Sequence, residues 1–182
     1  MKTSLGVPAV NLTIPVSQRD HIEGPIDAVI QLLEYGDFEC PFCGQVYPVI
    51  KAIQQKLGDR LCFAFRHFPL ANMHPNAEHV AEAAEAAGAQ GSFWQMHDLL
   101  FENQNALEDD DLVGYAAVLG LDTSRLMNEV MAGVYSRRVR EDFRSGVRSG
   151  VNGTPTLFIN GIRYDGDRGL EMMLAALMRA GE

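Results

Sequence analysis

The chain has 182 residues, of which 47% are hydrophobic, and it carries a formal net charge of −9 at pH 7. This length and apolar content suit one domain with a sizeable core, with room for an inserted subdomain. The acidic balance argues against nucleic acid or an anionic membrane surface as a partner. No apolar run approaches the roughly eighteen residues of a transmembrane helix, so membrane insertion is not expected.

The N-terminal segment shows no targeting signal. Lys2 supplies a positive charge, but the stretch Met1–Pro15 is interrupted by Gly6, Pro8 and Asn11 and has no sustained apolar run. As given, the sequence therefore predicts a cytoplasmic protein, or a periplasmic or otherwise extracytoplasmic one if a leader has been removed. Three cysteines are too few for a secreted disulfide framework.

The first part of the chain leads from an irregular arm into a strand. Residues 1–26 are interpreted as this arm, with Asn11–Ile14 as a candidate short edge strand and His21–Pro25 as a turn-rich link. Asp27–Tyr35 is almost continuously apolar, which is typical of a strand buried on both faces. Glu34 is the exception, at the end of this strand.

A helix and a second strand follow. Apolar residues recur at helical spacing over Pro41–Leu57, Gly58 is a typical stop, and Pro48 should kink the helix. Leu61–Phe65 has the alternation of a strand, with Cys62 expected to face the core as a small hydrophobic residue. A helix between two apolar strands predicts a right-handed βαβ unit with parallel strands.

The middle of the chain, residues 73–150, has no convincing strand signal and is interpreted as a helical insertion. The expected helices are His74–Gly88, Ser92–Glu102, Asp109–Gly120, Asp122–Gly133 and Tyr135–Ser149, the last with Val139, Phe143 and Val147 facing inward.

Strand signals return near the C-terminus. Thr154–Ile159 and Ile162–Tyr164 flank Asn160-Gly161, which is the strongest two-residue hairpin signal available. Leu170–Ala180 has apolar residues on one face and predicts a closing helix.

The motif Cys40-Pro41-Phe42-Cys43 opens the first helix and carries the main chemical signal. Residues i and i+3 lie on one side of a helical turn, so the two sulfurs can come within disulfide distance. With Cys40 at the N-cap and Pro41 at the first helical position, the helix dipole and the first-turn amides favour the Cys40 thiolate. Thiolate is the attacking species in disulfide exchange, so the motif predicts redox chemistry.

Two other interpretations of the motif are half of a zinc site and a purely structural disulfide. Zinc needs two further ligands, typically a second closely spaced pair. The only other cysteine is Cys62, and the pair His74 and His79 is not a plausible second half. No metal site is therefore predicted. His67 follows the second strand and is given no role, and His97 is expected to be a satisfied packing residue.

The order of elements and three motifs resemble the DsbA-like branch of the thioredoxin superfamily, which comprises thiol–disulfide oxidoreductases. The resemblance covers about residues 27–182. The motifs are Pro48, eight residues after Cys40, and the two runs Glu34-Tyr35-Gly36-Asp37-Phe38-Glu39-Cys40-Pro41-Phe42-Cys43 and Gly150-Val151-Asn152-Gly153-Thr154-Pro155-Thr156.

The resemblance implies an α/β protein with a thioredoxin fold, a central mixed sheet flanked by helices, and an inserted all-helical subdomain. The expected boundaries are an arm at 1–26, the thioredoxin-fold domain at 27–70 and 136–182, and the helical subdomain at 71–135. No metal or organic cofactor is implied. The expected partners are protein thiols and disulfides as substrates, together with an unidentified redox partner.

Carried over position by position, the resemblance makes Cys40 the nucleophile, which is expected to be partly exposed, and Cys43 the buried resolving cysteine. Pro155 corresponds to the cis-proline beside the active site, and Thr154 to the variable residue before it that faces the nucleophile. The backbone of Thr154 would then pair with an extended substrate peptide. The alternative for Pro155 is an ordinary trans proline at a strand start.

Glu34 corresponds to the family's buried acid beneath the sulfurs. In that position burial would raise its pKa, and the carboxyl would relay the proton of Cys43 during exchange. The alternative is a strand-end residue that reaches solvent.

The sequence departs from the strongly oxidising members in the dipeptide between the cysteines, where Pro41-Phe42 replaces their Pro-His. Pro41, Phe42 and Thr154 are the candidate substrate-binding residues. Phe42 cannot donate a hydrogen bond or a positive charge from its side chain, and Asp37 and Glu39 add negative charge nearby, so we expect weaker thiolate stabilisation and a less oxidising couple.

Three functions follow in order of preference. The first is a dithiol–disulfide oxidoreductase of the DsbA-like kind. The second is a non-enzymatic module in which the motif senses redox state or holds a metal. The third, a conjugating or isomerising relative, is disfavoured because such relatives generally lack the second cysteine, here Cys43.

Overall fold

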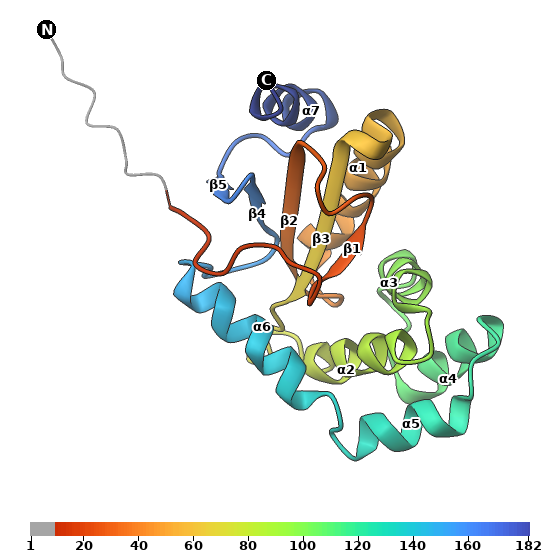
Figure 1. The fold of residues 1–182 in the computed structure, drawn as a ribbon. Helices are drawn as coiled ribbons and strands as arrows, with labels where there is room; N and C mark the ends of the chain where they lie inside the picture. Colours follow the sequence, from red (N-terminus) through yellow and green to blue (C-terminus); the bar gives the residue numbers. More distant parts are fainter. Residues whose placement is uncertain (1–9) are drawn as a thin grey trace, which may run out of the picture.

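The computed structural model describes residues 10–182, so residues 1–9 of the predicted arm, and that part of the targeting analysis, lie outside the described residues. The elements follow one another as shown in Figure 1. They are β1 (His21–Glu23), β2 (Ile30–Gly36), α1 (Pro41–Leu57), a 3-10 turn (Gly58–Arg60), β3 (Leu61–His67), α2 (Ala77–Gly88), α3 (Phe93–Glu102), α4 (Asp109–Val118), α5 (Thr123–Met131), α6 (Ser136–Arg148), β4 (Thr156–Ile159), β5 (Ile162–Tyr164) and α7 (Leu170–Ala180).

The strands form one mixed sheet in the order β1-β3-β2-β4-β5. β2 lies at the centre, parallel to β3 and antiparallel to β4, as the predicted βαβ unit and hairpin require. Its apolar residues alternate between the two faces, as expected for a strand. Leu32 packs in the core beneath α1 and α7, whereas Leu33 and Tyr35 pack on the opposite face.

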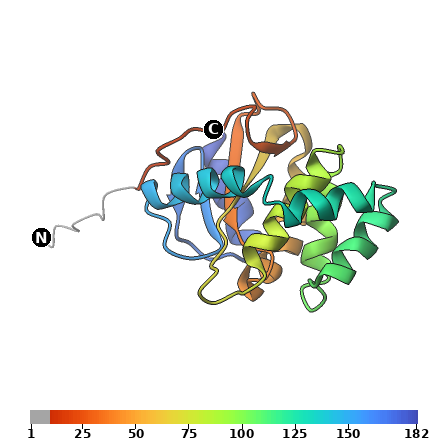
Figure 2. The same cartoon turned by 90° about the horizontal axis from the view of Figure 1, so that it is seen from below.

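Helices cover both faces of the sheet. Figure 2 shows the sheet lying between α6 and the pair formed by α1 and α7. Val46, Ile50 and Ile53 of α1 and Met173 and Leu177 of α7 are buried in one core. α1 and α7 have the bounds that their sequence predicted.

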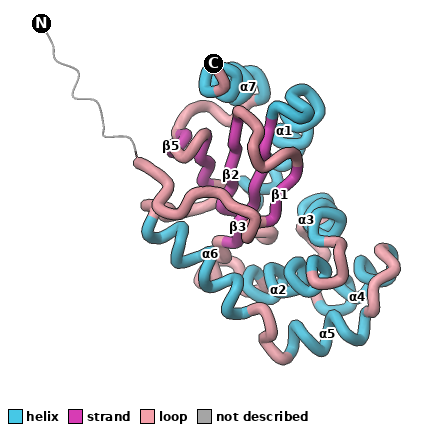
Figure 3. Tube along the Cα trace, viewed as in Figure 1, coloured by secondary structure: helices cyan, strands magenta, loops and turns pink. Residues whose placement is uncertain are grey.

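The helical insertion lies beside the sheet, and Figure 3 shows α2, α3, α4 and α5 gathered there. Its core includes the buried alanines of α2 and extends to Phe38, Cys40, Cys43 and Phe65. The helical insertion thus packs directly against the motif. The predicted α/β class, with an inserted all-helical part, is confirmed. Within residues 10–182 no helix has the length and apolar character needed to cross a bilayer.

The N-terminal segment differs from its prediction in two places. His21–Glu23, interpreted as a link, forms β1 and pairs antiparallel with β3. Three residues with polar ends give too weak a pattern to indicate a strand, and long-range pairing decides the outcome. Asn11–Ile14 forms only an isolated bridge from Asn11 to Ile162, with the Leu12 amide donating to the Gly161 carbonyl at 2.8 Å.

A buried ion pair attaches this segment to the sheet. The Arg66 guanidinium of β3 donates to Asp20 at 2.8 and 3.0 Å and to the carbonyls of Ile14 and Pro15 at 2.9 and 3.1 Å. It also donates to the Tyr35 hydroxyl at 2.9 Å. The arm is therefore irregular in shape but fixed in place.

Two predicted helices needed correction. α2 begins at Ala77, because the preceding His74 bonds to Asp37 instead of entering the helix. In α6 Val139 is buried as predicted, but Val147 is 53% exposed. The inward face of α6 uses polar residues in its place, and Ser145 hydrogen-bonds to the Tyr35 hydroxyl at 2.8 Å.

The predicted hairpin turn is confirmed. Asn160 and Gly161 have φ values of 46° and 79°, the left-handed values that a two-residue turn of this kind requires. The Asn160 side chain also accepts a hydrogen bond from the Gln31 amide at 2.7 Å, which ties the turn to β2.

Candidate active site

The residues around the motif place Cys40 at the start of α1. β2 ends at Gly36, and the Cys40 amide donates to the Asp37 carbonyl at 3.1 Å in the turn that follows. Cys40 is the N-cap residue with extended backbone angles, and Pro41 is the first residue of the helix. The predicted helix start is confirmed, so the first-turn amides of α1 face the Cys40 sulfur.

The environment of Cys40 favours its thiolate and lowers its pKa to about 5. The largest cause is a hydrogen bond from the Cys43 thiol, and burial opposes it. The Thr154 side chain and the backbone amides of Cys43 and Phe42 lower this pKa further. The Thr154 carbonyl oxygen also lies 3.5 Å from the Cys40 sulfur.

The pKa of Cys40 is lower than expected from the negative charges of Asp37 and Glu39 nearby. The Asp37 carboxylate is 2% exposed and accepts hydrogen bonds from the amides of Glu39 and Leu70 and from His74 Nδ1, at 2.8 to 2.9 Å. The Glu39 carboxylate is bound to the Asn76 amide at 2.9 Å. These hydrogen bonds stabilise the negative charge of both carboxylates. The two carboxylates therefore do not raise the pKa of Cys40 as expected.

His74 is part of this compensation. Burial lowers its pKa, but the hydrogen bond and charge of Asp37, together with the charges of Cys40 and Glu39, raise it above its ordinary value. The protonated form of His74 is therefore favoured more than in a free histidine, next to the Asp37 carboxylate.

The exposure of the cysteines differs from the prediction for Cys40, which was expected to be partly exposed. Its exposed fraction is 3%, while Cys43 and Cys62 are fully buried. The neighbouring Phe42 is 59% exposed. All three cysteines are free thiols in this structure.

Cys43 has the opposite electrostatic environment. Burial, its hydrogen bond to Cys40 and the negative charges of Glu34 and Cys40 all raise the pKa of the Cys43 thiol well above its ordinary value. The resting dithiol therefore holds one thiolate, on Cys40, and one proton, on Cys43.

Glu34 lies in the middle of the sheet, opposite Phe65 of β3 and Leu157 of β4, and is 2% exposed. Burial, and then the charge of Cys40, raise its pKa to about 8, against smaller opposing effects of Cys43 and Arg168. Its Oε1 atom has no hydrogen-bond partner among the described residues. The alternative of a solvated strand-end residue is therefore wrong.

The loop before β4 completes the site. The Thr154–Pro155 peptide bond is cis, as the resemblance implied, and β4 begins only at Thr156. The Arg168 guanidinium donates to the Pro155 carbonyl at 3.0 Å and so holds this loop from the segment before α7.

Two polar residues that contact the site could not be found from the sequence. The Gln104 amide, from the loop between α3 and α4, donates to the carbonyls of Phe38 and Cys40, both at 2.8 Å. Arg168 is the second, in contact with Pro155. Both residues are distant in sequence from the motif, and no local pattern marks them.

The structure shows the surroundings of His97 and His67. His97 is buried against aromatic rings as expected, and its Nδ1 bonds to Asp98 at 3.0 Å. Its Nε2 has no partner within the described part of the chain, so it is a packing residue with one unsatisfied nitrogen. His67 bonds to Glu85 at 2.9 Å, and neither nitrogen bonds to a cysteine.

Iodoacetamide is expected to alkylate Cys40 before Cys43 and Cys62 in the reduced protein at pH 6. With a pKa of about 5, roughly nine-tenths of Cys40 is thiolate at that pH, whereas burial raises the pKa of both other thiols. The low exposure of Cys40 slows the absolute rate without changing this order. Peptide mass spectrometry after a short pulse measures it, and labelling of Cys62 before Cys40 would show that the assignment is wrong.

Comparison with known proteins identifies the family of this chain and supports its fold. The profile of the family described as thioredoxin matches residues 17–179. Among solved structures, oxidised BdbD from Bacillus subtilis superposes with a TM-score of 0.84 at 20% identity, covering 95% of this chain and 98% of that one. Alpha-DsbA1 from Wolbachia pipientis gives a TM-score of 0.78 at 18% identity, covering 93% and 94%. These likenesses confirm the predicted thioredoxin fold of the DsbA-like kind.

A curated relative is much longer than this chain. A Salinispora arenicola protein named Na(+)/H(+) antiporter NhaA 1 is 43% identical over 172 residues, which is 94% of this chain but 26% of that protein. The chain thus spans about a quarter of the length of the curated relatives it matches.

Proposed function

The chain belongs to the thioredoxin family, and from this premise we propose that it is a thiol–disulfide oxidoreductase that exchanges disulfides with protein substrates through Cys40 and Cys43. The observation that carries the proposal is the unequal pair of thiols. The pKa of Cys40 is about 5, that of Cys43 is raised well above its ordinary value, and the buried acid Glu34 has a pKa of about 8. One sulfur is thus prepared to attack, and the other retains its proton until it is needed.

The reductive direction illustrates the proposed steps. The Cys40 thiolate attacks a substrate disulfide, forming a mixed disulfide and releasing one substrate thiolate. Cys43 then loses its proton and attacks the Cys40 sulfur, which releases the second substrate thiolate and forms the Cys40–Cys43 disulfide. The oxidative direction is the reverse of these steps.

Glu34 is proposed to accept the Cys43 proton. In the resting dithiol the Cys40 charge helps to raise the pKa of Glu34. Formation of the mixed disulfide removes that charge, so the pKa of Glu34 falls and its carboxylate becomes more populated at neutral pH. The base is therefore generated at the step in which Cys43 must be deprotonated.

Thr154 is proposed to bind the substrate peptide beside Cys40. Its carbonyl lies 3.5 Å from the Cys40 sulfur, so an extended segment that hydrogen-bonds to this loop is held with its own sulfur near the nucleophile. The exposed ring of Phe42 and the adjoining Pro41 offer apolar contact for the same segment.

Catalytic amounts of the chain are expected to accelerate the reduction of insulin by dithiothreitol, because Cys40 turns over while Glu34 relays the proton. The measurement is the onset of turbidity from the insulin B chain against the uncatalysed reaction. The same chain with Cys40 alkylated is the matched control. Equal onset times for the active and alkylated chains would contradict the proposal.

A second candidate is a redox-sensing module in which the dithiol changes state without turnover. It is favoured by the match to about a quarter of a protein named as a sodium–proton antiporter, because that name describes an activity other than disulfide exchange. The insulin assay separates the two candidates, because a sensor reacts once per chain and an oxidoreductase many times.

A further inference from the structure

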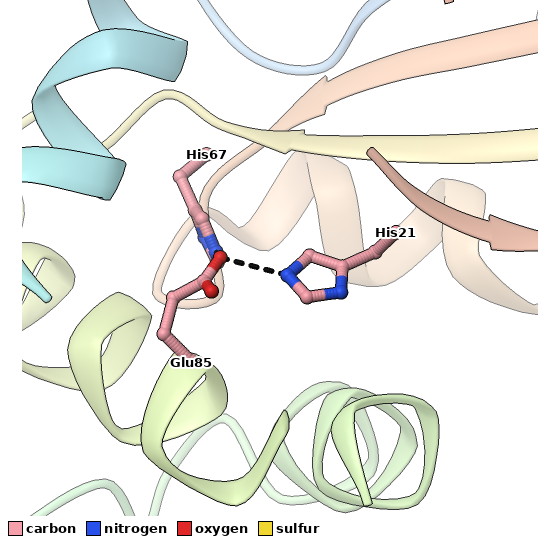
Figure 4. Close-up of side chains that lie close together, drawn as sticks. All are labelled: His21, His67 and Glu85. Atoms are coloured by element: carbon pink, nitrogen blue, oxygen red, sulfur yellow. Dashed lines mark hydrogen bonds and ion pairs between the residues drawn. The ribbon is translucent and has the colours of Figure 1, made fainter. Parts of the chain in front are cut away.

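Three residues outside the redox site converge on one point (Figure 4). His21 comes from β1, His67 from the end of β3 and Glu85 from α2. The Nε2 atoms of His21 and His67 lie 2.8 and 2.9 Å from the same atom, Glu85 Oε1. Two imidazole nitrogens and one carboxylate oxygen are a ligand set typical of transition metals.

The cluster is largely buried, unlike a chance grouping of surface side chains. The side chain of His67 is 1% exposed and that of Glu85 9%, while that of His21 is 21% exposed and leaves one side open. The His21 ring stacks on Phe93, with ring centroids 3.4 Å apart, and His67 packs edge-on against the same ring. Packing therefore fixes both imidazoles with Nε2 toward Glu85.

The charges around the cluster are compatible with a bound cation. Burial would raise the pKa of Glu85, but its bonds to His21 and His67 hold it below the ordinary value, so the carboxylate is ionised. Arg138 lies 3.7 Å from Glu85 Oε1, and its charge is matched by Asp142 at 3.4 Å. Asp142 is 1% exposed, and its Oδ1 has no hydrogen-bond partner within residues 10–182.

We propose that His21, His67 and Glu85 bind one divalent transition metal ion of the Zn²⁺ class. The ion would replace the hydrogen bonds that now join the two Nε2 atoms to Glu85 Oε1. Each imidazole binds a metal as the neutral ring with its single proton on Nδ1, and any proton displaced from Nε2 is released to solvent. Ligand atoms about 2.0–2.1 Å from zinc lie about 3.3 Å apart in a tetrahedron. The present separations of 2.8 and 2.9 Å need to open by only a few tenths of an ångström.

The ligand set also selects the class of ion. Calcium and magnesium require about six or more oxygen ligands, and this cluster offers one carboxylate and two nitrogens. The three protein ligands would leave a fourth position for water, which can reach the cluster because the His21 side chain is 21% exposed. The site contains no cysteine, which separates it from the zinc alternative considered for the motif.

A metal here joins two parts of the fold. His21 and His67 belong to the sheet, and Glu85 belongs to the first helix of the helical insertion. An ion that binds the folded state and not the unfolded chain raises stability by mass action. The proposed role is therefore structural, fixing the helical insertion against the sheet edge.

The test is a Zn²⁺ titration of the full chain without an affinity tag, carrying Cys40→Ser and Cys43→Ser so that the dithiol cannot bind zinc. Calorimetry should give one ion per chain, and free Zn²⁺ at about a hundredfold excess over Kd should raise Tm by about 5–10 °C. His21→Ala and Glu85→Gln should each weaken binding by about a hundredfold. His79→Ala is the matched control, since His79 also lies on α2 but bonds to Asp109.

Two results would overturn the proposal. One is the absence of binding heat and of any Tm shift with Zn²⁺ in the folded parent chain. The other is binding that His21→Ala and Glu85→Gln leave unchanged. Co²⁺ gives a further check, because at this site it should show visible d–d absorption without a thiolate charge-transfer band. A thiolate charge-transfer band would assign the metal to Cys62 and would also overturn the proposal. If Glu85→Gln fails to fold, the partly exposed His21→Ala decides.

Discussion

Replacing Cys43 by alanine is expected to stop catalysis at the mixed disulfide. The Cys40 thiolate can still attack a substrate, but no second thiol is left to release it, so turnover of insulin should fall by a factor on the order of 10³ or more. The same change should raise the pKa of Cys40 above its value of about 5, because the Cys43 thiol supplies the largest stabilisation of the thiolate. Non-reducing electrophoresis measures the trapped complex, and pH-dependent alkylation measures the pKa.

Two matched variants make this result specific. Cys40→Ala removes the attacking sulfur and should give neither turnover nor complex. Cys62→Ala removes a buried thiol outside the motif and should leave both turnover and complex formation close to those of the wild type. A Cys43→Ala chain that turns over at the wild-type rate would mean that Cys43 does not resolve the intermediate.

Glu34→Gln is expected to stabilise the reduced protein at neutral pH. The folded pKa of Glu34 is about 8 against an ordinary value of 4.5. Stability from this group is therefore fully present below pH 4.5 and is lost as the pH rises through 8. At pH 7 folding must return a proton to the carboxyl, which costs about 3 kcal/mol. Glutamine keeps the shape without this cost, so Tm should rise by about 6–12 °C at pH 7 and stay nearly unchanged at pH 4.

The measurement is a series of melting curves for reduced wild type and Glu34→Gln between pH 4 and 8. Glu171→Gln, which changes an exposed carboxylate at the start of α7, is the control and should alter stability by less than about 0.5 kcal/mol at every pH. A difference between Glu34→Gln and wild type that does not grow with pH would show that Glu34 does not titrate in this window.

The same variant should slow the release of the mixed disulfide. Without a carboxylate to accept the Cys43 proton, resolution near neutral pH should fall by a factor on the order of 10². Attack by Cys40 should change little, because its thiolate is held by Cys43, Thr154 and the first-turn amides of α1. Stopped-flow rates of the two steps separate these effects, and identical resolution rates from pH 5 to 8 would exclude the proton relay.

The sequence predicted those parts of the fold that local chemistry determines. α1 has its predicted bounds because Pro41 and Gly58 mark its ends, and the turn at Asn160-Gly161 follows from the backbone angles that these residues tolerate. The burial of Glu34 followed from its place in an apolar strand together with the family resemblance.

What the sequence could not show depends on contacts between distant residues. β1 is a strand only because β3 pairs with it, and Asp37 is compensated only because His74 reaches it from another loop. The convergence of His21 and Glu85 likewise requires the helical insertion to be folded against the sheet. Sequence reasoning therefore overestimated the effect of Asp37 on the Cys40 thiolate.

The contact from Gln104 limits how the protein can be reduced in size. Its amide supplies hydrogen bonds to the carbonyls of Phe38 and Cys40, on both sides of the turn that carries the nucleophile. Excising the helical insertion to obtain a minimal redox domain would leave these carbonyls without this donor and would uncover the apolar wall around Cys43. The helical insertion is thus part of the reactive centre. A shorter scaffold designed to carry the same cysteine pair needs another donor in place of the Gln104 amide.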